Sequence, residues 1–116
     1  SWQALRWTYN EGERSQEVIP EAGITIDLSD AVAATMAADG GIGITPNYVA
    51  APYVLRGELV PVLPQLIMER FPITALWPES RRGSPNVKAF LAFLAEVFPS
   101  PAPWDQAVAA HMPGAD

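Results

Sequence analysis

Residues 73–98 read "ITALWPESRRGSPNVKAFLAFLAEVF" and combine the two patterns that decide the fold. The segment 73–77 is mostly apolar and predicts a strand. Further along, Ser84 suits a helix cap and Pro85 suits the first helical position, where its missing N–H costs nothing. A strand followed by a helix indicates an α/β architecture.

The predicted helix over residues 85–98 has one wide apolar face. Lys88, Ala92 and Glu96 lie on the opposite face. The apolar positions recur at helical spacing, and they are Val87, Phe90, Leu91, Leu94, Val97 and Phe98. After this helix, residues 99–116 hold four prolines among small residues. They predict a mostly unstructured tail, in which Trp104 is the one residue suited to docking.

Upstream of this region the sequence predicts several short strands. Residues 5–20 indicate a hairpin with Gly12 in its turn. Apolar alternation or short apolar runs predict three more strands, at residues 23–28, 42–46 and 59–64. The last of these is expected at a sheet edge, because Pro61 cannot donate to a ladder.

Two helices are expected between these strands. The first is rich in alanine and covers 29–41, with Asp27 or Ser29 as its cap and glycine at its end. The second follows Pro46, with Pro52 limiting its length and Gly57 ending it. Strands separated by helices predict an α/β layer arrangement with a largely parallel sheet.

The glycines of "GGIGITPNYV", residues 40–49, raise the alternative of a phosphate-binding loop. Such a loop follows a strand and opens a helix, so that backbone amides converge on the anion. Here the glycines follow a predicted helix and precede a predicted strand, and neither GK[ST] nor G-x-G-x-x-G occurs. We therefore interpret Gly40 and Gly41 as a helix stop.

The composition excludes several function classes. The chain has 116 residues, enough for one compact domain, and its net charge of -6 gives no basic field for nucleic acid. It has no cysteine, which excludes disulfides and thiolate zinc sites and is compatible with the cytoplasm, where we expect the protein. No apolar run approaches the roughly 18 residues of a membrane span, so no membrane partner is expected.

The sequence does not pair a nucleophile with a base. His111 is the only histidine and lies in the predicted tail. Asp27 and Asp30 offer a carboxylate pair for acid–base chemistry, but helix capping and solvated surface explain them at less cost. Arg81 and Arg82 predict a solvated turn, with an anion contact as the alternative. We expect no enzymatic activity, no catalytic residue, no cofactor and no metal site.

The order of these motifs resembles the C-terminal part of LysR-type transcriptional regulators. The shared features are the small-residue helix, "GIGITP" at 41–46, "GELVPVLP" at 57–64 and "WPESRRGSPNVKAFLAFL" at 77–94. The similarity covers about residues 2–98. The family usually has glycine at the position of Asp39 and a polar residue at the position of Leu28.

The resemblance implies an effector domain like a type 2 periplasmic binding protein, a three-layer α/β sandwich with a mixed sheet. Two subdomains joined by crossover strands would enclose a small-molecule effector. Residues 1–72 would form part of the second subdomain, 73–98 the returning crossover strand and C-terminal helix of the first subdomain, and 99–116 a tail. The chain starts without methionine, so we expect an incomplete fragment that binds DNA only through a missing N-terminal domain. We also expect self-association, or a second chain, at helix 85–98.

Effectors in open α/β sheets bind beyond the carboxyl ends of strands, near helix N-termini. This rule indicates two loops, one after the strand at 23–28 and one at the end of the strand at 42–46. The expected effector-binding residues are Asp27, Leu28, Ser29, Asp30, Gly43, Ile44, Thr45 and Pro46. The alternative function is a free-standing small-molecule (solute) binding α/β domain without a transcriptional role.

Overall fold

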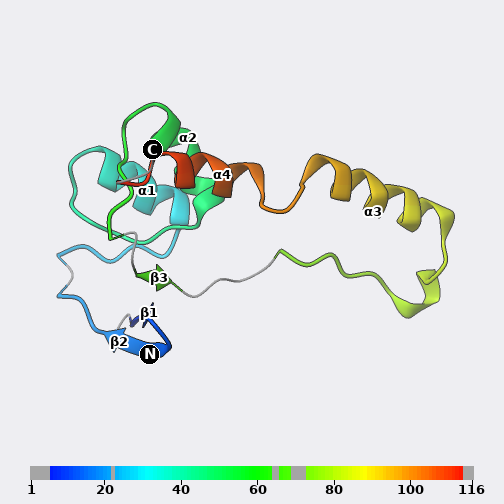
Figure 1. Cartoon of the computed structure of the whole chain (residues 1–116), viewed down its shortest axis with the longest axis horizontal. Coiled ribbons are helices and arrows are strands. Elements are labelled where there is room, and N and C mark those ends of the chain that lie inside the picture. Colours follow the sequence, from blue (N-terminus) through cyan, green and yellow to red (C-terminus); the bar gives the residue numbers. More distant parts are fainter. Residues whose placement is uncertain (1–5, 22, 64–65, 69–72, 114–116) are drawn as a thin grey trace.

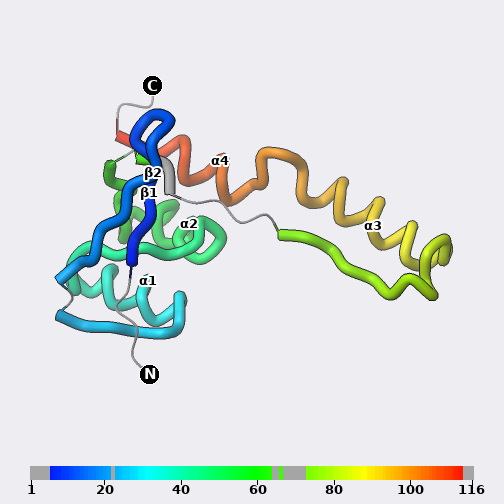
Figure 2. The backbone as a smooth tube through the Cα atoms, turned by 90° about the horizontal axis from the view of Figure 1, so that it is seen from below, coloured from blue at the N-terminus to red at the C-terminus, as the bar shows by residue number. Residues whose placement is uncertain are grey.

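The structure, a computed structural model, describes residues 6–21, 23–63, 66–68 and 73–113. Its elements follow in the order β1 (Trp7–Glu11), β2 (Arg14–Val18), α1 (Ser29–Ala37), α2 (Asn47–Leu55), β3 (Ile67–Met68), η1 (Glu79–Arg81), α3 (Pro85–Val97) and α4 (Pro103–Ala110). Three helices, α1, α2 and α4, gather into a helical body beside a small sheet, whereas α3 projects away from them (Figure 1). The same separation is seen after a rotation of 90° (Figure 2). We call α1, α2 and α4 the helical body, and residues 73–98 the arm.

The N-terminal hairpin confirms the sequence prediction. β1 (Trp7–Glu11) pairs antiparallel with β2 (Arg14–Val18). Gly12 opens the two-residue loop with φ +63°, a conformation that glycine adopts without a steric penalty. The other edge of β1 pairs with β3 (Ile67–Met68), also antiparallel, which gives the strand order β2-β1-β3. The sheet is therefore antiparallel, and the expectation of largely parallel pairing is wrong for the described residues.

Four other predicted strands are wrong. The described residues form no strand at 23–28, 42–46, 59–63 or 73–77, and residue 64 of the predicted strand 59–64 lies outside the described residues. Several apolar side chains in these segments are exposed, and Ile42 and Leu76 are 76% and 89% exposed. An extended stretch becomes a strand only when another backbone supplies its hydrogen-bond partners. Within the described ranges, these segments meet no such backbone.

α1 (Ser29–Ala37) and α2 (Asn47–Leu55) confirm the two helices predicted upstream. The predicted cap of α1 is wrong, because the cap position is Leu28 and no side chain accepts a hydrogen bond there. Ser29 is already the first helical residue, and Asp27 precedes the cap position.

In both helices the residue after the C-cap has a positive φ. After α1 this residue is Asp39, with φ 65°, while the amide of Gly40 donates to the carbonyl of Thr35 at 2.9 Å. A Cβ on Gly40 would lie 2.6 Å from atoms of Thr35, so this close approach requires glycine. Gly57, with φ +76°, ends α2 as predicted, but Pro52 lies inside the helix without stopping it.

α4 (Pro103–Ala110) corrects the prediction of an unstructured tail. Its Val108 is buried together with Ala51 and Val54 of α2, and these three residues form the core cluster of the helical body. Partly buried apolar residues surround them, namely Ala50, Leu59, Trp104, Ala107 and Met112. The tail therefore folds because it packs against the apolar face of α2. Composition alone does not reveal this tertiary contact.

The arm contains η1 (Glu79–Arg81) and α3 (Pro85–Val97). Ser84 takes the cap position of α3 and Pro85 the first helical position, as predicted. The structure describes all thirteen residues of α3, and none of them is buried. No helix in the described parts of the chain is long and apolar enough to cross a membrane.

The surface of the molecule is large for its mass. The accessible area is 9426 Å², whereas a compact monomer of this size exposes about 6,200 Å². The radius of gyration is 17.4 Å, against about 13 Å for a compact domain of the same length. The arm accounts for this shape in Figure 1, since its helix lies beyond the body rather than on it. Much apolar surface is therefore left without a partner.

Candidate functional site

The two loops that the sequence predicts at the effector site lie together at the start of the two helices. The hydroxyl of Thr45 donates to the backbone carbonyl of Ser29 at 3.3 Å. Both residues are half-buried. This hydrogen bond joins the loop before α2 to the first turn of α1.

Packing against α1 holds the same loop. A Cβ on Gly43 would lie 2.9 Å from the Sδ atom of Met36 and 3.3 Å from a methyl carbon of Val32. The absence of a side chain at Gly43 thus lets the backbone approach α1 closely. Pro46 then takes the cap position of α2 with φ -60°.

The other predicted site residues are less constrained. Leu28 takes the cap position of α1, and Asp30 lies in its first turn. Their side chains are exposed, as are those of Asp27 and Ile44. Among the described residues, no hydrogen bond joins the carboxylates of Asp27 or Asp30 to either loop. The structure therefore brings Ser29, Gly43, Thr45 and Pro46 into one packed unit and leaves the other four predicted residues at its surface.

The electrostatics of this region are acidic. Residues 23–55 contain no lysine or arginine, and the carboxylates of Asp27 and Asp30 flank Ser29. The cap residues of α1 and α2 are Leu28 and Pro46, and neither side chain accepts a hydrogen bond from the first amides of its helix. The next cation is Arg56, and its hydrogen bonds to Glu58, 3.2 and 3.2 Å long, raise the pKa of its guanidinium. The region thus offers backbone donors and negative charge.

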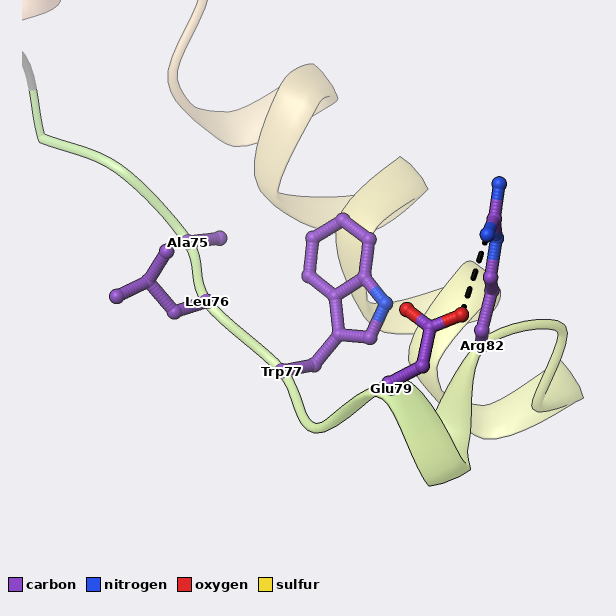
Figure 3. A pocket seen from close by; sticks show the side chains of 5 residues that line it. All are labelled: Ala75, Leu76, Trp77, Glu79 and Arg82. Carbon is purple, nitrogen blue, oxygen red and sulfur yellow. Dashed lines mark hydrogen bonds and ion pairs between the residues drawn. The ribbon is translucent and has the colours of Figure 1, made fainter.

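A hollow of about 380 Å³ lies in the arm and was not expected from the sequence (Figure 3). It is lined by Ala75, Leu76, Trp77, Glu79 and Arg82. Arg82 pairs with Glu79 at 3.1 Å, and both side chains are largely exposed. This pairing supports the prediction of a solvated turn over that of an anion contact. The hollow includes no residue of the two predicted loops.

Sequence reasoning also missed the neighbours of the first turn of α2. The side-chain amide of Asn47 donates to the carboxylate of Asp105 at 2.7 Å, and Trp104 lies edge-on to Tyr48. One signal was present, because Pro103 followed closely by Asp105 is typical of a helix start. No described group of three histidine, cysteine, aspartate or glutamate residues is arranged to hold a metal ion.

Comparison with known proteins points to one family. The LysR substrate binding domain family matches residues 1–99. A curated relative, an HTH-type transcriptional repressor of Pseudomonas aeruginosa (strain UCBPP-PA14), is 35% identical over 95 residues. The match covers 79% of this chain but only 29% of that repressor. No solved structure matches the chain.

These findings define the class of the protein, an α/β domain of the periplasmic-binding-protein type. The chain belongs to the LysR substrate binding domain family. The resemblance seen in the sequence motifs is thereby confirmed, and α4 lies beyond the part of the chain that matches the family.

Proposed function

We propose that this chain is the effector-sensing part of a LysR-type transcriptional regulator, with the loops 27–30 and 43–46 as one wall of the effector cleft. The hydrogen bond from Thr45 to Ser29 carries the proposal, since it gathers polar groups of both loops at two helix N-termini. DNA binding is then the task of a domain outside this chain. The match to a much longer HTH-type repressor supports this division of labour.

The charge of the wall favours a neutral or cationic effector. Asp27 and Asp30 would repel an anion at the helix N-termini, and neither carboxylate is engaged as a cap. Ser29 and Thr45 supply hydroxyl groups, and the uncapped first turns supply amides. An effector with hydroxyl, carbonyl or amine groups and no net negative charge would suit these donors and acceptors.

The test uses the intact regulator and a thermal-shift panel of carboxylates, amines and neutral hydroxylated compounds. A compound that binds the folded state raises the melting temperature. In the double variant Ser29→Ala, Thr45→Ala, we expect its affinity to fall about tenfold, because two hydrogen bonds are removed. The matched control, Thr74→Ala with Ser80→Ala, removes the same groups from the exposed arm. Equal affinities in the double variant and the wild type would contradict the site.

The arm is part of the same proposal. Residues 1–72 belong to one effector subdomain, while 73–98 complete another subdomain or dock on a second copy of this chain. The accessible area exceeds that of a compact monomer by about 3,200 Å², and obligate interfaces bury about 2,000–5,000 Å². For the chain on its own, the proposed occupant is a second copy, which docks on the apolar face of α3.

The proposal includes no catalysis. We expect the chain to turn over no substrate. A catalytic activity that a point substitution in this chain abolishes would contradict this expectation. A second check is genetic, because the coding sequence upstream of Ser1 should encode a DNA-binding domain. An upstream region with no such domain would favour a free-standing solute-binding domain instead.

A further inference from the structure

α4 follows the part of the chain that matches the family. It contacts α2, whose first residue directly follows the proposed effector loop 43–46. The family match ends at residue 99, and α4 begins at Pro103. Asp105 accepts a hydrogen bond of 2.7 Å from the side chain of Asn47, which is the first residue of α2. Residues 43–46 directly precede Asn47, so this contact lies at the end of the proposed site loop.

Aromatic packing supports the same placement. The ring centroids of Trp104 and Tyr48 are 6.2 Å apart, and the interplanar angle of 76° is an edge-on geometry. The ring centroids of Trp104 and Phe98 are 5.5 Å apart. Deeper in the interface, Val108 is buried in the core cluster that it shares with α2. α4 is therefore fixed along its length, and its first turn meets the first turn of α2.

A continuous series of contacts leads from α4 to α1. Asp105 holds Asn47, the cap residue Pro46 precedes Asn47, and the hydroxyl of Thr45 donates to the carbonyl of Ser29. A shift of the first turn of α2 would move Pro46 and Thr45 with it, because these two residues directly precede Asn47 in the chain.

We infer that α4 is a clamp that sets the geometry of the loop 43–46, with Asp105 and Trp104 as positioning residues for the effector site. The site role rests on the proposed function, whereas the clamp itself rests only on the contacts described above. The clamp is a feature of this chain in addition to the family domain, since it lies outside the matched residues.

The first test measures amide hydrogen exchange by NMR in the full chain, with no ligand added. The amides of Val49 and Ala50 both donate to the carbonyl of Pro46 at 3.0 Å and report on the first turn of α2. Asp105→Ala should speed their exchange about two- to tenfold, the effect of losing one exposed hydrogen bond to a charged group. The amide of Val32 in α1 donates to the carbonyl of Leu28 at 3.0 Å, and its exchange rate should not change.

Two further variants show whether the effect comes from the contact itself. Asn47→Ala should reproduce the change, and the double variant with Asp105→Ala should add nothing to it. Gln106→Ala is the matched control, because it removes the hydrogen bond of 2.8 Å to Pro101 within the same segment but leaves α2 untouched. Unchanged exchange at Ala50 in Asp105→Ala, or an equal change in Gln106→Ala, would overturn the clamp.

The second test asks whether the clamp serves the site. It uses the intact regulator and the compound that raises its melting temperature most in the panel above. Asp105→Ala should weaken the affinity for that compound about two- to tenfold, and Gln106→Ala should not change it. If only the Ser29 and Thr45 variant weakens binding, the site role of α4 is overturned and the proposed function stands. If none of the variants weakens binding, the proposed function falls, and the exchange data still decide the clamp.

Discussion

The helical body and the arm have similar apolar content, but the body buries apolar side chains and the arm leaves them exposed. α2 reads NYVAAPYVL and buries Ala51 and Val54, which is 4% exposed. α3 reads PNVKAFLAFLAEV and has a regular apolar face, yet Phe90 and Phe93 remain 59% and 56% exposed. The difference lies in the neighbours, because α2 has α1 and α4 beside it. Apolar periodicity thus predicts which face needs burial but not what buries it.

The largest expected effect concerns the uncovered face of α3. We predict that the unmodified chain self-associates at tens of micromolar and that Phe90→Glu with Leu94→Glu yields a monomer. A micromolar dissociation constant corresponds to a binding free energy of about 8 kcal/mol. Burying two unpaired carboxylates in the interface would cost enough to abolish the association. Sedimentation checks the mass, and circular dichroism checks that the fold is kept. Lys88→Glu, on the opposite face, is the control.

A stable monomer at tens of micromolar, with the amides of α3 protected from hydrogen exchange, would mean that the chain buries this face itself. The contrast between body and arm would then disappear, and with it the assignment of residues 73–98 to an unpartnered arm.

The next effect tests the body against the arm directly. Val54→Asp places a carboxylate in the core cluster and should reduce the free energy of unfolding by about 3 to 5 kcal/mol. Phe93→Asp changes an exposed position of the arm and should cost less than about 0.5 kcal/mol. Denaturant unfolding followed by circular dichroism compares the two, at a concentration where the chain is monomeric. Equal losses would show that both regions share one core.

A smaller effect is expected at the end of α1. Asp39 adopts φ 65°, a conformation that glycine takes without strain. Asp39→Gly should therefore raise the free energy of unfolding by about 0.5 to 1 kcal/mol. Gly83, in the arm, has φ +87°, so alanine at this position would be strained. Because the arm lies outside the helical body, Gly83→Ala should not change the melting temperature of the body. Thermal unfolding of both variants makes the comparison, and a loss of stability in Asp39→Gly would contradict it.

The smallest effect is expected at the ion pair in the arm. Arg82 and Glu79 are 3.1 Å apart, and their side chains are 78% and 83% exposed. Solvent screens such pairs, so Arg82→Ala should change the free energy of unfolding by less than about 0.5 kcal/mol. Denaturant unfolding at low and at high salt checks this, and a larger loss that salt removes would show that the arm supports the body.

The sequence alone determined the elements whose hydrogen bonds are local. In α1, α2 and α3 the amides beyond the first turn, prolines excepted, donate mainly to a carbonyl four residues back, so propensity and apolar spacing are sufficient to locate these helices. The hairpin needs only a two-residue loop with Gly12 at its first position. The motif order also indicated the family, because it depends on residue identities rather than on contacts. For the site, the sequence indicated the two loops before α1 and α2.

The tertiary structure decided everything that requires a distant partner. The segments at 23–28, 42–46 and 73–77 have strand-like composition, but a ladder needs a second backbone, and the described chain brings none to them. α4 folds only because α2 presents Ala51 and Val54 to Val108. The bond from Thr45 to Ser29 joins residues that are sixteen positions apart. Local patterns carry no information on such pairs, since the free energy that forms them comes from packing and pairing across the fold.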